Sequence, residues 1–60
     1  MDPNAALRRI DEADRIDADT RDAMIGLYGW LLGGGFPPDW ALYPKGTKRF
    51  RKKFGTQRGM

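Results

Sequence analysis

Residues 23–38, AMIGLYGWLLGGGFPP, form a run of 16 residues without a charged side chain. In a chain of 60 residues, this run supplies much of the apolar surface that folding can bury. A helix that crosses a bilayer needs about 20 apolar residues, whereas this run ends in three glycines and two prolines. We therefore expect a buried core rather than a membrane span. Insertion into a membrane interface, assisted by the basic segment that follows, is the less favoured alternative.

Short length limits the ways in which this chain can be stabilised. A domain of this size buries only about 60% of the surface of its unfolded chain. Cys and His are both absent, so neither a disulfide nor an ordinary metal site can add stability. The remaining means are tight helix packing, self-association and a binding partner.

The same composition argues against an enzyme. Ser, Cys and His are missing, which removes the usual nucleophiles and the usual general base. A calcium loop of the EF-hand type fails as well, because a loop starting at Asp14 places Asp19 where Gly is needed and Ile25 where Glu is needed. We predict a non-enzymatic protein with no cofactor and no metal site.

Helical spacing predicts two antiparallel helices, at about 3–16 and 20–32. Asp2 can cap the first helix, and Pro3 suits its first position. Asp19 is the expected cap of the second helix, and the three glycines 33–35 are expected to end it. The apolar positions that follow helical spacing are Ala6, Leu7, Ile10 and Ala13 in the first helix and Met24, Leu27, Tyr28 and Leu31 in the second.

Three glycines lie on one side of the second helix, namely Gly26, Gly29 and Gly33. An interior glycine costs a helix about 1 kcal/mol relative to alanine, so the pattern favours a strip where another backbone comes close. That backbone could belong to the first helix or to a second copy of the chain. Glycines that are merely tolerated in a short packed helix are the simpler explanation.

The segment 36–44, FPPDWALYP, is expected to be an extended strap over the helical hairpin, because its prolines disfavour helix. Its large apolar side chains (Phe36, Trp40, Leu42 and Tyr43) would cover the second helix and enlarge the core. A proline-rich ligand for an aromatic groove is the alternative function of such a segment.

Charge is strongly segregated along the chain. Residues 1–39 carry eight acids and four bases, whereas residues 40–60 carry seven bases and no acid. Thr47 can cap a short third helix in this basic segment, and Gly55 can end it, but its like charges repel one another. The predicted fold is therefore a small all-α protein: a helical hairpin with an aromatic, Pro-rich strap over residues 1–44, then a basic tail or short third helix over residues 45–60.

Basic residues interleaved with aromatic ones suit nucleic acid, because cations bind phosphates and aromatic rings stack on unpaired bases. The leading hypothesis is a small accessory protein that contacts DNA or RNA without sequence specificity through this tail. The candidate residues are Lys45, Lys48, Arg49, Phe50, Arg51, Lys52, Lys53, Phe54 and Arg58. A solvated tail, or one attracted to the acidic half of the chain, is the alternative interpretation.

A protein–protein module is the second hypothesis, with a larger protein or a second copy of the chain as partner. Aromatic side chains are typical of interaction hot spots, and Trp30 lies off the apolar face of its helix. We expect Trp30 to be partly exposed. The candidate interface residues are Gly26, Gly29, Trp30, Gly33, Phe36 and Trp40.

Residues 27–40, LYGWLLGGGFPPDW, resemble a turn found in short uncharacterised proteins of actinobacteria and their phages. In those proteins a helix ending in Trp-Leu is followed by Gly-Gly-Phe and a proline. The resemblance covers about a quarter of the chain and implies no activity. Together with the lack of Cys, it implies the cytoplasm of a bacterium or of a phage-infected host cell.

Overall fold

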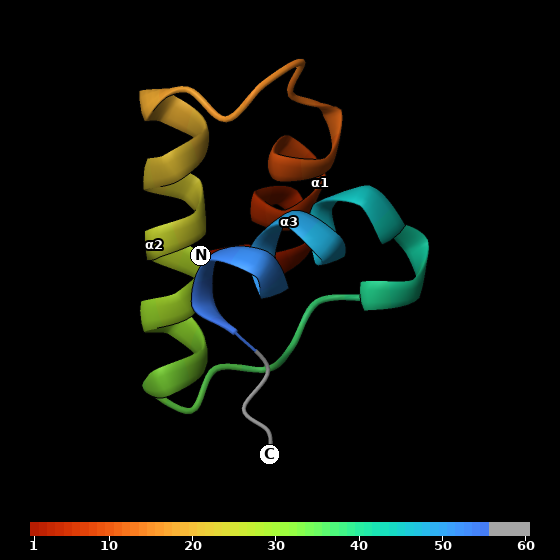
Figure 1. Ribbon diagram of the computed structural model, residues 1–60. Coiled ribbons are helices and arrows are strands. Elements are labelled where there is room, and N and C mark those ends of the chain that lie inside the picture. Colours follow the sequence, from red (N-terminus) through yellow and green to blue (C-terminus); the bar gives the residue numbers. More distant parts are fainter. Residues whose placement is uncertain (56–60) are drawn as a thin grey trace.

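A computed structural model describes residues 1–55 of the chain as a bundle of helices (Figure 1). The elements are α1 (Pro3–Glu12), α2 (Ala18–Leu32), the short 3₁₀ helix η1 (Trp40–Leu42) and α3 (Pro44–Phe54). No strand occurs among the described residues, and the prediction of a small all-α protein is confirmed. In Figure 1, α2 stands at one side, α1 and α3 lie together beside it, and η1 lies at the opposite side.

Helix α1 begins where the sequence predicts and ends earlier than expected. The Asp2 carboxylate accepts hydrogen bonds from the backbone N–H groups of Asn4 and Ala5, at 3.0 and 3.3 Å. The helix stops at Glu12 instead of residue 16, and Ala13 is already extended. A tertiary contact explains the difference, because the carbonyl groups at this end accept hydrogen bonds from Arg49 of α3 instead of from a further helical turn.

Helix α2 is capped by Asp17 and not by Asp19 as predicted. The early end of α1 leaves Asp17 extended, and its carboxylate accepts a hydrogen bond from the Thr20 N–H at 2.9 Å. Asp19 instead lies in the first turn, where its charge still favours the helix dipole. The predicted glycine end is confirmed, since Gly34 takes a positive φ of 89° and donates its N–H to the Leu31 carbonyl.

The core is small and takes side chains from all three α-helices. It consists of Leu7 and Ile10 from α1, Met24 and Leu27 from α2, and Phe50 from α3. Helix α1 is central, because it packs against both α2 and α3. The basic segment therefore does form a helix, and this helix completes the core through Phe50.

The strap contributes to the core with only part of its apolar surface. Trp40 and Tyr43 pack against the core cluster, whereas Phe36 and Leu42 stay 61% and 63% exposed. Helix α3 begins at Pro44, three residues before the predicted cap Thr47. Thr47 is instead buried, and its hydroxyl donates to the Trp40 carbonyl at 2.9 Å, which joins η1 to α3.

Two helices approach closely at Gly46, a position that the sequence analysis did not single out. A Cβ atom there would lie 2.7 Å from the Leu7 carbonyl oxygen and 2.9 Å from the Asp11 Cβ. The predicted glycine strip on α2 is not used in this way. A Cβ at Gly29 would meet nothing within 4 Å, and one at Gly26 would meet only the Met1 side chain.

We predict that Gly46→Ala lowers the free energy of unfolding by about 1–2 kcal/mol, because the overlap with backbone atoms of α1 outweighs the better helix propensity of alanine. Gly29→Ala is the matched control, since it also replaces a helical glycine but enters open space. It should raise stability by about 0.5–1 kcal/mol. Urea denaturation followed by far-UV circular dichroism measures both changes. Equal stability of the two variants would contradict the close approach.

A second prediction concerns pH. The Thr20 N–H and hydroxyl hydrogen bonds lower the pKa of the Asp17 carboxyl below its usual value of 3.8. The ionised cap therefore stabilises the native state fully above the usual pKa, and this contribution is lost as pH falls through the lower native pKa. Asn keeps an acceptor oxygen but does not titrate in this range. The stability advantage of the wild type over Asp17→Asn should shrink between about pH 5 and pH 2 in thermal melts. A difference independent of pH would contradict this role of Asp17.

Candidate functional site

Helix α3 presents a line of lysines to solvent. Lys45, Lys48 and Lys52 are three and four residues apart, so they share one face of the helix, and all three are exposed. We call these three residues the basic ridge. Arg51 and Lys53 flank it and are exposed too. No acid occurs between residues 40 and 60, so the ridge has no anionic neighbour on its own helix.

Arg49 has a structural task in addition to its charge. Its Nη1 atom donates to the carbonyl oxygens of Ile10 and Ala13, at 2.8 and 2.7 Å, and the side chain is half-buried. These bonds cap the carboxyl end of α1, where a cation also suits the helix dipole. In return, the Asp11 carboxylate accepts a hydrogen bond from the Gly46 N–H in the first turn of α3. We call this pair of contacts the α1–α3 clamp.

Of the two phenylalanines predicted to stack on bases, Phe50 is buried and Phe54 is partly buried against α2. Phe50 is only 7% exposed and belongs to the core. Phe54 is stacked on Tyr28 of α2, with ring centroids 4.3 Å apart and an interplanar angle of 2°. Arg58, the last candidate of the tail, lies outside the described residues. The aromatic side chain that accompanies the basic ridge is Trp40.

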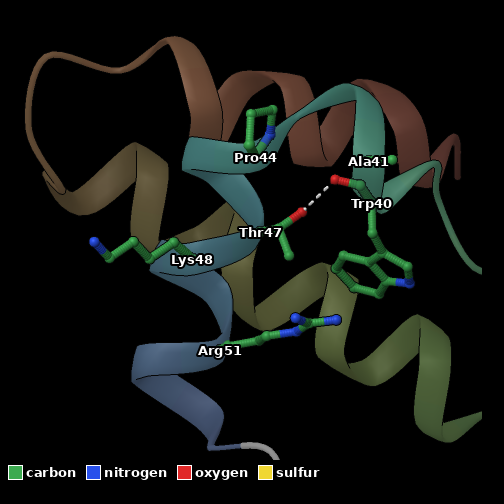
Figure 2. A pocket seen from close by; sticks show the side chains of 6 residues that line it. All are labelled: Trp40, Ala41, Pro44, Thr47, Lys48 and Arg51. Atoms are coloured by element: carbon green, nitrogen blue, oxygen red, sulfur yellow. Dashed lines mark hydrogen bonds between the residues drawn. The ribbon is translucent and has the colours of Figure 1, made fainter.

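An open groove runs between η1 and α3, beside the ridge (Figure 2). Its lining combines apolar atoms with two cations and contains no acid; the residues are Trp40, Ala41, Pro44, Thr47, Lys48 and Arg51. We call it the Trp40 groove. The Arg51 guanidinium carbon lies over the indole, 6.0 Å from the ring centroid. Figure 2 shows the Arg51 side chain extending from α3 toward the Trp40 ring.

Two hydrogen bonds at the start of η1 fix its position and therefore that of Trp40. The Asn4 side-chain oxygen accepts a hydrogen bond from the Asp39 N–H at 2.7 Å, and the Thr47 hydroxyl holds the Trp40 carbonyl. The indole itself packs on Phe50, with centroids 5.6 Å apart. The sequence analysis placed Trp40 in a protein interface. Trp40 precedes Lys45 by only five residues, and this short separation was the sequence feature that could have placed it beside the basic segment.

A second open hollow shares no lining residue with the Trp40 groove. Four of its lining residues are cationic and none is acidic; the set is Ile16, Arg21, Met24, Arg49, Lys52 and Lys53. Arg21 comes from α2, in the otherwise acidic half of the chain. The positive surface therefore extends beyond residues 45–60, because it includes Arg21, which was not among the residues predicted to bind nucleic acid.

Among the residues predicted for a protein interface, Trp30 and Phe36 contact each other, and Trp40 packs on Phe50 of α3. Trp30 is half-buried, its Nε1–H donates to the Phe36 carbonyl at 2.8 Å, and its ring meets that of Phe36 edge to face. This contact closes the turn after α2. The outward face of α2 instead exposes Ile25 and Leu32, at 55% and 71%, on either side of Gly29.

No ion pair joins the acidic half of the chain to the basic half among the described residues. Within residues 1–55 the ion pair is Arg8–Glu12, at 3.7 Å on the surface of α1. The halves meet through the α1–α3 clamp, in which side chains bind backbone groups. The cations of the basic ridge are consequently not neutralised by described carboxylates.

Comparison with protein-family models, with curated proteins and with solved structures gave no match. None of the described helices is long and apolar enough to cross a membrane. Residues 1–55 also contain no group of three acidic side chains placed to hold a metal ion.

The α1–α3 clamp generates a prediction that separates Arg49 from its neighbours. Arg49→Gln removes two charge-assisted hydrogen bonds to α1 and should lower the free energy of unfolding by about 1–3 kcal/mol. Lys52→Gln removes the same charge from an exposed position and should change stability by less than about 0.5 kcal/mol. Chemical denaturation of both variants tests the difference. If Arg49→Gln were as stable as Lys52→Gln, the Arg49 half of the clamp would contribute nothing.

Proposed function

We propose that this protein is a small non-enzymatic accessory protein that binds nucleic acid without sequence specificity through the exposed face of α3. The observation that carries the proposal is the basic ridge beside the Trp40 groove. Five exposed cations lie on one helix with no acid among them; they are Lys45, Lys48, Arg51, Lys52 and Lys53. Such a surface attracts a phosphate backbone and releases its condensed counterions.

The clamp refines the set of residues that would contact phosphates. Arg49 is half-buried with two backbone partners, so it holds the ridge in place and is not counted as a phosphate ligand. Five contacts give a slope of log affinity against log salt of about −3.5 for a single strand and about −4.5 for a duplex. Binding should therefore weaken strongly at physiological salt.

The side chains on α3 favour binding without sequence preference. The helix contains neither Asn nor Gln, which recognise adenine in pairs of hydrogen bonds. Three of the five exposed cations are lysines on the ridge, and lysine acts on phosphates as a mobile point charge. The contacts therefore suit the backbone rather than base edges. A cytoplasmic protein would meet such polyanions as RNA or DNA.

A protein–protein contact through α2 is the second candidate function. The observation that favours it is the exposed apolar face with Ile25 and Leu32, where Gly29 allows close approach. A second copy of the chain or a larger protein would be the partner. Light scattering over a range of protein concentrations tests whether a second copy of the chain binds, because self-association raises the measured mass. Salt should scarcely weaken an apolar contact of this kind.

We expect the triple variant Lys45→Gln, Lys48→Gln, Lys52→Gln to bind labelled oligonucleotides more weakly and to flatten the salt slope by about 2–3. These side chains are exposed, so helical content should not change. Fluorescence anisotropy at about 50 and 200 mM salt measures both affinity and slope.

The matched control is Arg8→Gln, Arg9→Gln, Arg15→Gln, which removes three positive charges from exposed positions before α2. It should leave the salt slope almost unchanged, because these residues lie outside the ridge. If the two triple variants lost affinity equally, net charge alone would account for binding. If the wild type failed to bind at low salt, α3 would not be a nucleic-acid site and the α2 face would become the leading candidate.

A further inference from the structure

We propose that the Trp40 groove holds one unpaired nucleobase, stacked on the Trp40 indole and covered by the Arg51 guanidinium. The protein then prefers single-stranded nucleic acid to a duplex. This inference rests on the proposed function, and it names the class of ligand that the same site takes. Four observations support it: the position of Arg51 over the indole, the rigid support of the indole, the continuity with the basic ridge and the lack of an acid in the lining.

The Arg51 guanidinium lies over the Trp40 ring, where it can cover a base that stacks on the indole. The Arg51 guanidinium carbon is 6.0 Å from the indole centroid. A base stacked on the indole would lie about 3.4 Å above it, so the guanidinium has to move outward to cover the base. The Arg51 side chain is exposed, and its guanidinium has no hydrogen bond or ion pair with described residues. The guanidinium is therefore able to swing outward and admit a base, on which it also stacks well.

The indole is held in place before any ligand arrives. Its ring packs on the buried Phe50, and its backbone is tied to Thr47 of α3. At the residue just before Trp40, the Asn4 side-chain oxygen accepts a hydrogen bond from the Asp39 N–H. A platform that is already ordered loses little conformational entropy on binding, so more of the stacking energy appears as affinity.

The groove also provides for the phosphates that flank a base. Lys48 belongs both to the lining of the Trp40 groove and to the basic ridge. A strand with one base in the groove would therefore place the phosphates next to that base beside Lys48. The phosphates further along the strand would lie on the ridge. In a duplex the bases are paired and stacked inside the helix, so the same groove would bind no base. Duplex binding would be limited to the phosphate contacts.

The test compares an oligothymidylate of about 12 nucleotides with an abasic oligomer of the same length and charge. The wild type should bind the oligothymidylate about tenfold more tightly, because only this probe can stack. Trp40→Leu should lose that difference, weakening binding of oligothymidylate about tenfold and binding of the abasic oligomer hardly at all. Phe36→Leu removes an aromatic ring that is 61% exposed outside the groove, so it should change neither affinity.

The outcomes distinguish this inference from the proposed function. Equal affinity of the wild type for both probes, with a steep salt slope, would overturn the base site and leave the phosphate site intact; this comparison needs no variant. Binding of neither probe would overturn both proposals. Circular dichroism shows whether Trp40→Leu stays folded. Polyglutamate that bound as tightly as oligothymidylate and lost affinity equally in Trp40→Leu would also overturn the assignment, in favour of an acidic polypeptide.

Discussion

The arrangement of this molecule depends on the α1–α3 clamp. The start of α3 is held by the Asp11 carboxylate, and the end of α1 is held by the Arg49 guanidinium. Both contacts satisfy backbone groups that helix ends leave without partners. Gly46 lets the two helices approach until a side chain would no longer fit between them. A basic segment that would be a weak helix alone is thereby fixed against the central helix.

Several other features follow from that docking. Once α3 lies on α1, Phe50 can enter the core beside Leu7 and Ile10, and the acid-free face of the helix points to solvent. The Thr47 hydroxyl then donates a hydrogen bond to the Trp40 carbonyl in the middle of the strap and fixes Trp40 at the edge of this face. The core alone is small, with five buried apolar side chains among the described residues. Polar contacts at helix ends consequently decide the geometry to a greater extent than in a larger domain.

Sequence reasoning predicted the features that depend on neighbouring residues. The Asp2 cap, the glycine end of α2 and the all-α class follow from local preferences, and the structure confirms them. The errors arose where distant residues take part. Nothing near Glu12 indicates that α1 stops there, because the reason is Arg49, which lies 37 positions further along the chain. Likewise, nothing in the sequence around Gly46 indicates that this glycine faces the backbone of α1. The regularly spaced glycines of α2 suggested close packing, but Gly29 has no neighbour within 4 Å.

The candidate site shows the same division. Charge segregation located the basic surface, since a cation-rich segment without acids keeps most of its charge in water. The role of each residue could not be predicted, because Arg49 and Phe50 are neighbours of Lys48 in sequence but point toward the protein. Trp40 was separated from the basic residues by an expected boundary at residue 44. In the structure this boundary falls at the start of α3, and the two sides of it form one groove.

Helix α3 therefore combines two properties that oppose each other. It completes the core, yet its six cations within 11 residues repel one another when they are brought onto one short helix. A polyanion that binds the folded form relieves this repulsion and shifts the folding equilibrium by mass action. At a free ligand concentration 100 times the dissociation constant the gain is about 2.7 kcal/mol, a large share of the stability available to so small a domain. Under the proposed function, folding and anion binding would be thermodynamically linked, and free and ligand-saturated protein would differ in melting temperature by many degrees.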